Sequence, residues 1–236
     1  MPRALPPRSE AVVVSIGGSV LITGQNDRPY LEELAATLRR VGARRPLAVT
    51  TGGGRTAREY IRIGRELGLT EVELDELGID VTRLHARLLA ARIGPPAPAH
   101  PPETIRATVA ALAAGSPVVL GGTEPGHTTD GVAALLAVRL RAARVVNATD
   151  VDGAYDLDPR TNPQARRIDR MDWPEFRTMV HQRSTGEAGQ NFLFDRLGAD
   201  LLARAAIPLA IVAGRDLANL EKAIEGRPFA GTRIGA

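Results

Sequence analysis

The chain has 236 residues, of which 44% are hydrophobic and 24% charged, with a net charge of +3. This composition predicts a globular protein with a sizeable core and excludes disordered and fibrous classes. The absence of cysteine excludes disulfides and thiolate metal sites and favours a cytoplasmic location. The arginines are scattered among acids and no apolar run reaches about 18 residues, so we expect neither nucleic acid nor a membrane as partner.

Residues 1–10 form a proline-rich start that we expect to be a loose tail. After it, short runs rich in β-branched residues alternate with helical patterns along the chain. Buried strands are predicted at 11–16, 46–50, 117–120, 144–149 and 208–213. Helices are predicted at 29–42, 55–67, 73–93, 102–115 and 130–143. Strands that alternate with helices predict a mainly parallel sheet with right-handed crossovers.

Glycine, serine, threonine and aspartate follow each predicted strand directly. The first strands end in GGSV and GGGR, the third in GGTEPGHTTD, the fourth in TDVDGAYDLDP and the fifth in AGRD. Ligands of an open parallel sheet bind at the carboxyl ends of its strands. Backbone amides beside a helix N-terminus form an anion site, so three glycine-rich turns predict a row of phosphates along this edge.

The common nucleotide and metal signatures are absent from the sequence. A P-loop and the protein-kinase set need a lysine that the chain lacks near its glycines, because its single lysine is Lys222. GGGRTA imitates a dinucleotide fingerprint, but Asp75 opens a helix instead of ending a strand. In DVDGAYDLD the glycine comes too early for an EF-hand. The histidines are too widely spaced for a metal cluster; they are His85, His100, His127 and His181.

Six segments follow, in order, the motifs of one family. They are VVVSIGGSV, TTGGGRTAREYI, ELDELGIDVTRLHARLL, GGTEPGHTTDGVAALLA, ATDVDGAYDLDP and AGRDLANLEKAIEGRPFAGTRI. Together they resemble archaeal-type uridylate (UMP) kinases of the amino acid kinase superfamily. The resemblance implies a single domain over 11–236 with a three-layer α/β/α sandwich, an acceptor-binding part at about 11–142 and an ATP-binding part at about 143–236. It also implies transfer of the ATP γ-phosphate to UMP, with Mg²⁺, in a homo-oligomer, usually a hexamer arranged as a trimer of dimers.

The resemblance assigns one group of residues to ATP. Gly17, Gly18 and Ser19 match the first phosphate loop, and Ser19 is also expected to cap the following segment. Gly54 belongs to the second loop, and Arg58 matches the family's phosphate-contacting arginine. A guanidinium can bridge two phosphate oxygens, so Arg58 is the expected catalytic residue. The remaining expected ATP contacts are Thr149, Tyr155 and Asp158.

A second group is assigned to UMP. Asp75 matches the carboxylate that binds the ribose hydroxyls, and Gly53 lies between donor and acceptor phosphates. The loop around uracil and the acceptor phosphate is matched by Thr123, Glu124, Pro125, Gly126, His127, Thr128 and Thr129. Asp130 is expected to cap the next helix, with water-mediated metal binding as the alternative. No protein ligand for a metal is assigned, because Mg²⁺ arrives with ATP.

Some positions depart from the family pattern or have no role in it. Ser15 stands where the wider superfamily usually has a lysine that contacts the transferring phosphoryl group, and DRLGAD replaces a DPLAAK-like segment. Arg83 is expected to support packing or a subunit contact, while Arg55, Arg62 and Arg65 are expected on solvated faces. Two alternatives stay open: a superfamily kinase with another acceptor, and a protein that binds nucleotides or oxyanions without catalysis.

Overall fold

A computed structural model describes residues 9–159, 161–183 and 193–235. The predicted tail therefore lies outside the described residues up to residue 8, and Ser9 is hydrogen-bonded to the carbonyl oxygens of Leu140 and Arg141. The central sheet has seven strands. In spatial order they are β3 (Val118–Leu120), β2 (Leu47–Thr51), β1 (Val12–Ile16), β4 (Arg144–Thr149), β8 (Leu209–Ala213), β9 (Thr232–Ile234) and β7 (Arg170–Met171).

All five predicted strands are confirmed, and they pair in parallel from β3 to β8. Their core positions carry valine, isoleucine, leucine and alanine, which fit strands buried on both faces. The sequence reading missed β9, which pairs antiparallel with β8, and the edge strand β7. It also missed a separate two-stranded sheet, β5 (Ala154–Tyr155) with β6 (Arg167–Ile168). These elements are two or three residues long, too short for a periodic pattern.

Nine helices are present in the described part of the chain. They are α1 (Gly18–Leu21), α2 (Asp27–Gly42), α3 (Gly54–Glu66), α4 (Glu71–Ile93), α5 (Ile105–Ala114), α6 (Thr129–Leu140), α7 (Trp173–Arg183), α8 (Arg196–Arg204) and α9 (Leu217–Glu225). The five predicted helices correspond to α2–α6. The start of α4 is fixed by a capping box, in which Thr70 and Glu73 bond each other's backbone N–H groups.

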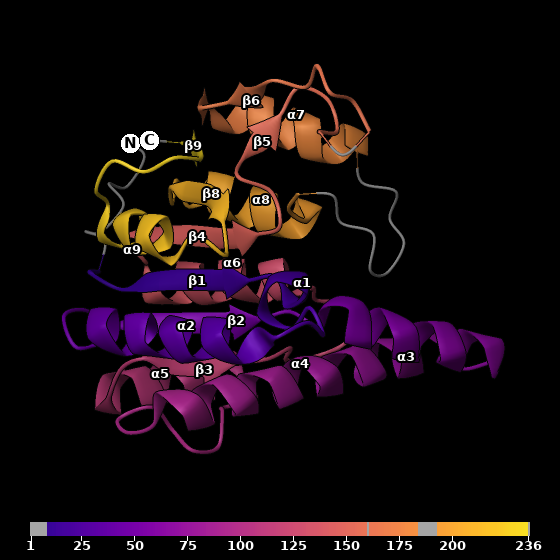
Figure 1. The fold of residues 1–236 in the computed structure, drawn as a ribbon, viewed down its shortest axis with the longest axis vertical. Coiled ribbons are helices and arrows are strands. Elements are labelled where there is room, and N and C mark those ends of the chain that lie inside the picture. Colours follow the sequence, from indigo (N-terminus) through magenta and orange to yellow (C-terminus); the bar gives the residue numbers. More distant parts are fainter. Residues whose placement is uncertain (1–8, 160, 184–192, 236) are drawn as a thin grey trace, which may run out of the picture.

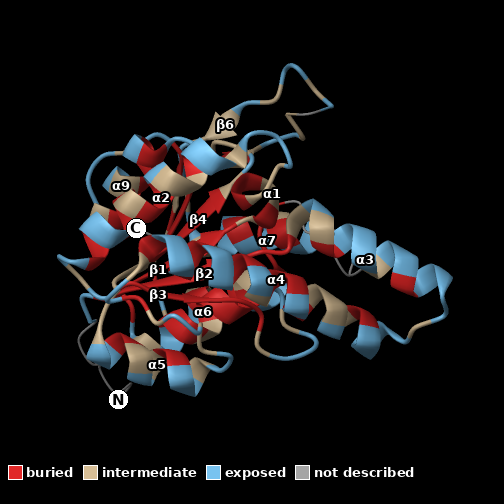
Figure 2. Ribbon diagram, turned by 60° about the horizontal axis from the view of Figure 1, so that its bottom comes forward, coloured by how far each residue is buried: buried red, intermediate tan, exposed pale blue. Residues whose placement is uncertain are grey.

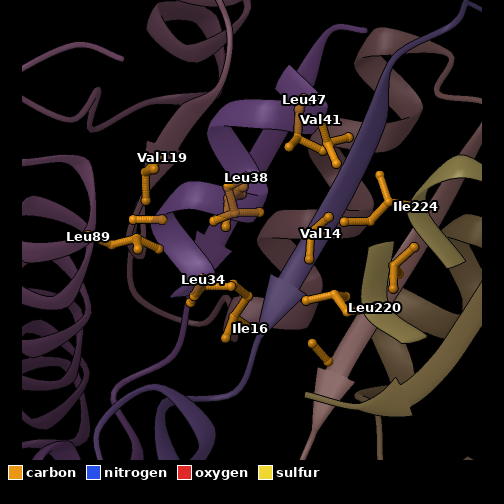
Figure 3. Packing of buried hydrophobic residues seen from close by; sticks show 14 of the residues in the cluster. Val14, Ile16, Leu34, Leu38, Val41, Leu47, Leu89, Val119, Leu220 and Ile224 are labelled. Carbon is orange, nitrogen blue, oxygen red and sulfur yellow. The ribbon is translucent and has the colours of Figure 1, made fainter. Parts of the chain in front are cut away.

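Two hydrophobic clusters lie on the two faces of the sheet. On one face, Val14 and Ile16 of β1 pack with residues of α2, α4 and α9, among them Leu38, Leu89 and Leu220 (Figure 3). The other cluster joins the alternate residues of the strands to α5, α6, α7 and α8. This is the predicted three-layer α/β/α sandwich with a mainly parallel sheet.

The pair α3 and α4 projects beyond the sheet at the carboxyl ends of the strands (Figure 1). Much of α3 is exposed there, while the strands and the inner helix faces are buried (Figure 2). None of the helices in the described ranges combines the length and apolar composition needed to cross a bilayer.

Candidate active site

A cleft of about 960 Å³ lies at the carboxyl ends of the strands. Most of the predicted site residues line it: Gly17, Gly18, Ser19, Gly53, Gly54, Arg58, Asp75, Glu124, Gly126, His127, Thr128, Thr129 and Thr149. The lining does not include Thr123, Pro125, Tyr155 or Asp158. The structure thus brings both glycine loops and most of the predicted acceptor loop, residues 123–129, to one cleft.

The two glycine loops pack directly against each other at the floor of this cleft. A Cβ on Gly18 would lie 2.2 Å from the backbone nitrogen of Gly54, and a Cβ on Gly54 would lie 2.4 Å from the carbonyl carbon of Gly18. Gly54 also has φ of +60°, which favours glycine. The loops therefore need glycine for close backbone contact as well as for access to a ligand.

Arg58 points from α3 toward the N-terminal end of α1. Its Nη2 donates a hydrogen bond of 3.2 Å to Oγ of Ser19, so the two predicted phosphate contacts are adjacent. The predicted capping role of Ser19 is wrong. Ser19 lies inside α1, whose N-cap is Gly17 and lacks a side-chain cap bond. Its hydroxyl faces Arg58 instead.

The outer arginines of α3 behave largely as expected. Arg62 forms exposed ion pairs with Glu59 and Glu66. Arg65 forms an exposed ion pair with Glu71. Exposed pairs of this kind contribute little to stability. Arg55 is exposed too, but its Nη2 donates to the carbonyl oxygen of Thr23 and so connects α3 to the segment after α1.

Two side chains of α4 support the loops from behind. The ring Nδ1 of buried His85 lies 2.8 Å from the carbonyl oxygen of Gly52 and holds the second glycine loop. Arg83 donates to the carbonyl oxygens of Gly122 and Thr123, which confirms its expected packing role. Sequence reasoning missed the function of His85, since nothing local signals a contact across 33 residues.

Asp75 joins α4 to the acceptor loop. Its Oδ2 accepts a hydrogen bond of 2.8 Å from the backbone N–H of Gly126. Within the loop, the hydroxyl of Thr123 is buried without a hydrogen-bond partner, and Nδ1 of His127 lies 3.3 Å from Glu124 without hydrogen-bond geometry. A buried polar atom without a partner is costly, and a polar ligand would supply one.

The N-cap of α6 is Thr128, so the prediction that Asp130 is the cap is wrong. Oγ1 of Thr128 accepts a hydrogen bond from the N–H of Gly131. Asp130 lies in the first turn, where it benefits from the helix dipole. Its Oδ1 accepts a 2.8 Å hydrogen bond from Oγ of Ser15, the residue that departs from the family pattern.

A second carboxylate, Asp195, approaches the same place from α8. It is the N-cap of α8 and accepts hydrogen bonds from the N–H of Gly198 and from the hydroxyl of Thr128. Burial, together with the negative charge of Asp195, raises the pKa of Asp130 to about 7. Burial also raises the pKa of Asp195. The sequence reading missed Asp195, although an aspartate directly before a helical run is an N-cap signal.

The three predicted ATP contacts in and after β4, Thr149, Tyr155 and Asp158, do not lie together. Thr149, at the end of β4, lines the cleft, and its hydroxyl donates to Asp150. Tyr155 lies in β5 and donates a 2.6 Å hydrogen bond to Asp152, which also pairs with Arg167. The backbone carbonyl of Asp158 accepts hydrogen bonds from Thr161 and Asn162 in a turn. Only Thr149 of the three therefore contacts the cleft in this conformation.

The cleft is rich in carboxylates. Its lining includes two arginines, Arg58 and Arg196, and six acids: Glu71, Asp75, Glu124, Asp130, Asp150 and Asp195. Across the described ranges, no group of three or more histidine, cysteine or acidic residues is placed to hold a metal ion. One or two carboxylates together with substrate phosphates suit Mg²⁺, so this donor set fits a magnesium ion delivered by a nucleotide.

Comparisons with known proteins agree with this geometry. A family model described as "Amino acid kinase family" matches residues 10–213. Uridylate kinase of Thermoplasma volcanium is 42% identical over 226 residues, which cover 96% of this chain and 98% of that protein. The crystal structure of uridylate kinase from Archaeoglobus fulgidus is 38% identical, with a TM-score of 0.84, and the match covers 94% of this chain and 99% of that one. The UMP kinase structure from Bacillus anthracis, 20% identical with a TM-score of 0.77, shows the same fold. The chain belongs to the amino acid kinase family.

Proposed function

We propose that the protein is a uridylate kinase, which transfers the γ-phosphoryl group of ATP to UMP and forms UDP and ADP. The observation that carries the proposal is the near-complete match to proteins named uridylate kinase, such as that of T. volcanium, at 42% identity. The cleft supports it, since glycine loops, Arg58 and most of the predicted acceptor loop, including His127 with its unpartnered Nδ1, converge there.

In the proposed reaction, an oxygen of the UMP phosphate forms a bond to the γ-phosphorus of ATP. The bond from that phosphorus to the bridging oxygen of ADP breaks. The acceptor oxygen is already deprotonated, so the reaction needs positioning and charge neutralisation and no general base. The backbone amides of Gly18 and Gly54 face the phosphates, and Arg58 spans oxygens of the transferring group, while the amide of Gly17 donates to the carbonyl oxygen of Ala148.

On the acceptor side, Asp75 holds the ribose hydroxyls while it anchors Gly126, so one carboxylate both orders the loop and binds the sugar. Thr129 presents its hydroxyl at the N-terminus of α6, where a phosphate is favoured, while the hydroxyl of Thr128 caps that helix and donates to Asp195. His127 of the cleft lining supplies an unpartnered ring nitrogen toward the base. Mg²⁺ would supply charge neutralisation, and Asp130 or Asp150 of the cleft lining would hold it through water.

A coupled ADP-release assay with Mg-ATP and UMP, CMP or dCMP tests the proposal, with UDP identified directly by chromatography. We expect turnover that is fastest with UMP. Turnover only with another acceptor would support a different kinase of the family, and ATP binding without any turnover would support a binding protein. We also propose a cytoplasmic homo-oligomer, a hexamer arranged as a trimer of dimers, which a native mass measurement tests.

A further inference from the structure

We propose that Thr82 is a positioning residue of the acceptor site, which fixes the start of the acceptor loop at Gly122 against α4. The proposal rests on the proposed function for the identity of the acceptor, UMP. Thr82 has no part in the reaction described above, and only 8% of its surface is exposed.

Two hydrogen bonds give the hydroxyl of Thr82 a single orientation. It donates to the carbonyl oxygen of Ile79, one turn earlier in α4, and accepts from the backbone N–H of Gly122; both bonds are 2.6 Å long. A hydroxyl has one proton, so the bond to Ile79 uses that proton and leaves a lone pair for Gly122. Gly122 is buried, and its N–H is therefore bonded to a directed acceptor 40 residues away in the chain.

Consecutive residues of α4 bind both backbone polar groups of Gly122. Thr82 accepts from its N–H, and the guanidinium of Arg83 donates to its carbonyl oxygen at 3.2 Å and to that of Thr123 at 3.1 Å. The two backbones are also in contact, since a Cβ on Gly121 would lie 2.6 Å from the backbone nitrogen of Arg83. The segment after β3 therefore has one position relative to α4, and the acceptor loop starts from it.

The acceptor loop is held to α4 at a second point, which the proposed reaction also uses. Asp75 lies two turns before Thr82 and accepts from the N–H of Gly126 on the exposed side of the loop. The ribose hydroxyls of UMP would bind this same carboxylate. The buried contact at Thr82 would keep the loop in place while Asp75 binds the sugar. Thr82 thus sets the spacing between Asp75 and the loop residues His127 and Thr129.

The methyl group and the backbone of Thr82 face the second glycine loop. Its Cγ2 lies 3.5 Å from where a Cβ on Gly53 would be, and its carbonyl oxygen accepts a 2.9 Å hydrogen bond from Oγ1 of Thr51 at the end of β2. The hydroxyl therefore serves the acceptor loop, and the rest of the residue serves the second glycine loop. A substitution that removes only the hydroxyl should affect the acceptor and spare the donor.

Two substitutions separate these parts of the side chain. Thr82→Val removes the hydroxyl but keeps the branched shape, and it leaves the N–H of Gly122 buried without this acceptor. Thr82→Ser keeps the hydroxyl and removes the methyl group. The matched control is Thr108→Val on α5, where a fully buried threonine outside the cleft lining donates to the carbonyl oxygen of Thr104 at 2.8 Å.

We expect Thr82→Val to raise KM for UMP about tenfold, while KM for Mg-ATP changes by less than about twofold. The Kd for UMP, measured by calorimetry, should rise by a similar factor. Thr82→Ser should recover most of this loss, and Thr108→Val should lower Tm without a change in kinetics. A merely structural role would raise both KM values together or lower kcat in step with Tm. That result, or an unchanged KM for UMP, would overturn the inference.

Amide hydrogen exchange gives a readout that needs no turnover. In the parent protein, the N–H of Gly122 should exchange more slowly than that of Gly126, because its bond is buried and the bond of Gly126 is exposed. Thr82→Val should speed exchange at Gly122 by about tenfold or more, whereas Thr82→Ser and Thr108→Val should not. If the parent protein makes no UDP, the proposed function fails while these rates still test whether Thr82 holds the loop. Exchange at Gly122 as fast as at Gly126 in the parent, or unchanged in Thr82→Val, would refute the positioning role.

Discussion

Substitution of Gly18 by alanine tests whether the two glycine loops must touch. Alanine within a helix normally stabilises by about 1 kcal/mol relative to glycine. Here the added Cβ would lie 2.2 Å from the nitrogen of Gly54 and 2.5 Å from the carbonyl oxygen of Gly52. These are backbone atoms, so relief requires one loop to move away from the other. Overpacking of this kind costs about 1–3 kcal/mol, which outweighs the helical gain. We therefore expect a net destabilisation of up to about 2 kcal/mol, and a displacement of the loop amides.

Gly78→Ala is the matched control for stability. Gly78 also lies inside a helix, α4, but its added Cβ would meet only Cδ1 of Ile61, at an ordinary 3.5 Å. Urea unfolding should show a lower free energy of unfolding for Gly18→Ala and a higher one for Gly78→Ala than for the parent protein. In thermal unfolding, each kcal/mol should shift Tm by about 2–4 °C. Turnover of Gly18→Ala should fall by about 100-fold or more, since small misplacements near the reacting groups are costly. A stable and fully active Gly18→Ala would refute the close contact.

Three other variants probe single interactions. Arg58→Ala should lower kcat by about 100-fold while Tm changes little. The control Arg62→Ala removes an exposed, ion-paired arginine of the same helix and should leave the steady-state kinetics unchanged. Equal kinetics for the two variants would show that Arg58 has no catalytic role. Asp130 has a pKa of about 7 when folded against 3.8 when unfolded, so the folded state binds more protons between these values and its stability is lost as pH rises from about 4 to 7. Asp130→Asn should therefore gain stability over the parent at pH 8 by about 2–4 kcal/mol but not at pH 4, in denaturant titrations; parallel pH profiles would contradict the assignment. Tyr30→Phe removes the buried hydrogen bond from Tyr30 to the carbonyl oxygen of Gly214 and should cost about 1 kcal/mol in the same titration, while a neutral result would mean that water replaces the bond.

The main strands could be predicted because their burial on both faces demands runs of β-branched and aliphatic residues. The short strands β9 and β7 carry no such pattern, and their places depend on pairing, of β9 with β8 and of the edge strand β7 with β9. The glycine loops were also readable, because glycine after a strand is a local signal. The role of glycine in these loops could not be predicted, because the contact of Gly18 with Gly54 depends on two neighbouring strands that end at the same level.

The cap of α6 shows where local signals fail. Thr128 and Asp130 are both good N-cap residues, and the sequence alone does not distinguish between them. Partners distant in the chain decide the outcome. Ser15 occupies a carboxylate oxygen of Asp130, and Asp195 fixes the hydroxyl of Thr128. The same long-range contacts bring Asp195 and Arg196 to the cleft, which no local pattern in residues 193–204 could show.

The acidic lining of the cleft offers an electrostatic explanation for why the proposed phosphate site is built from glycine loops. Six carboxylates beside two arginines would repel phosphates if side chains alone bound them. Backbone amides and helix N-termini carry positive partial charge without a titratable group, and they reach a ligand only where side chains do not intervene. In the proposed reaction, the glycine loops, Mg²⁺ and Arg58 would together offset this negative charge at the phosphates. The carboxylates would then stay available for sugar hydroxyls and for the metal, which would let donor and acceptor bind side by side despite their charge.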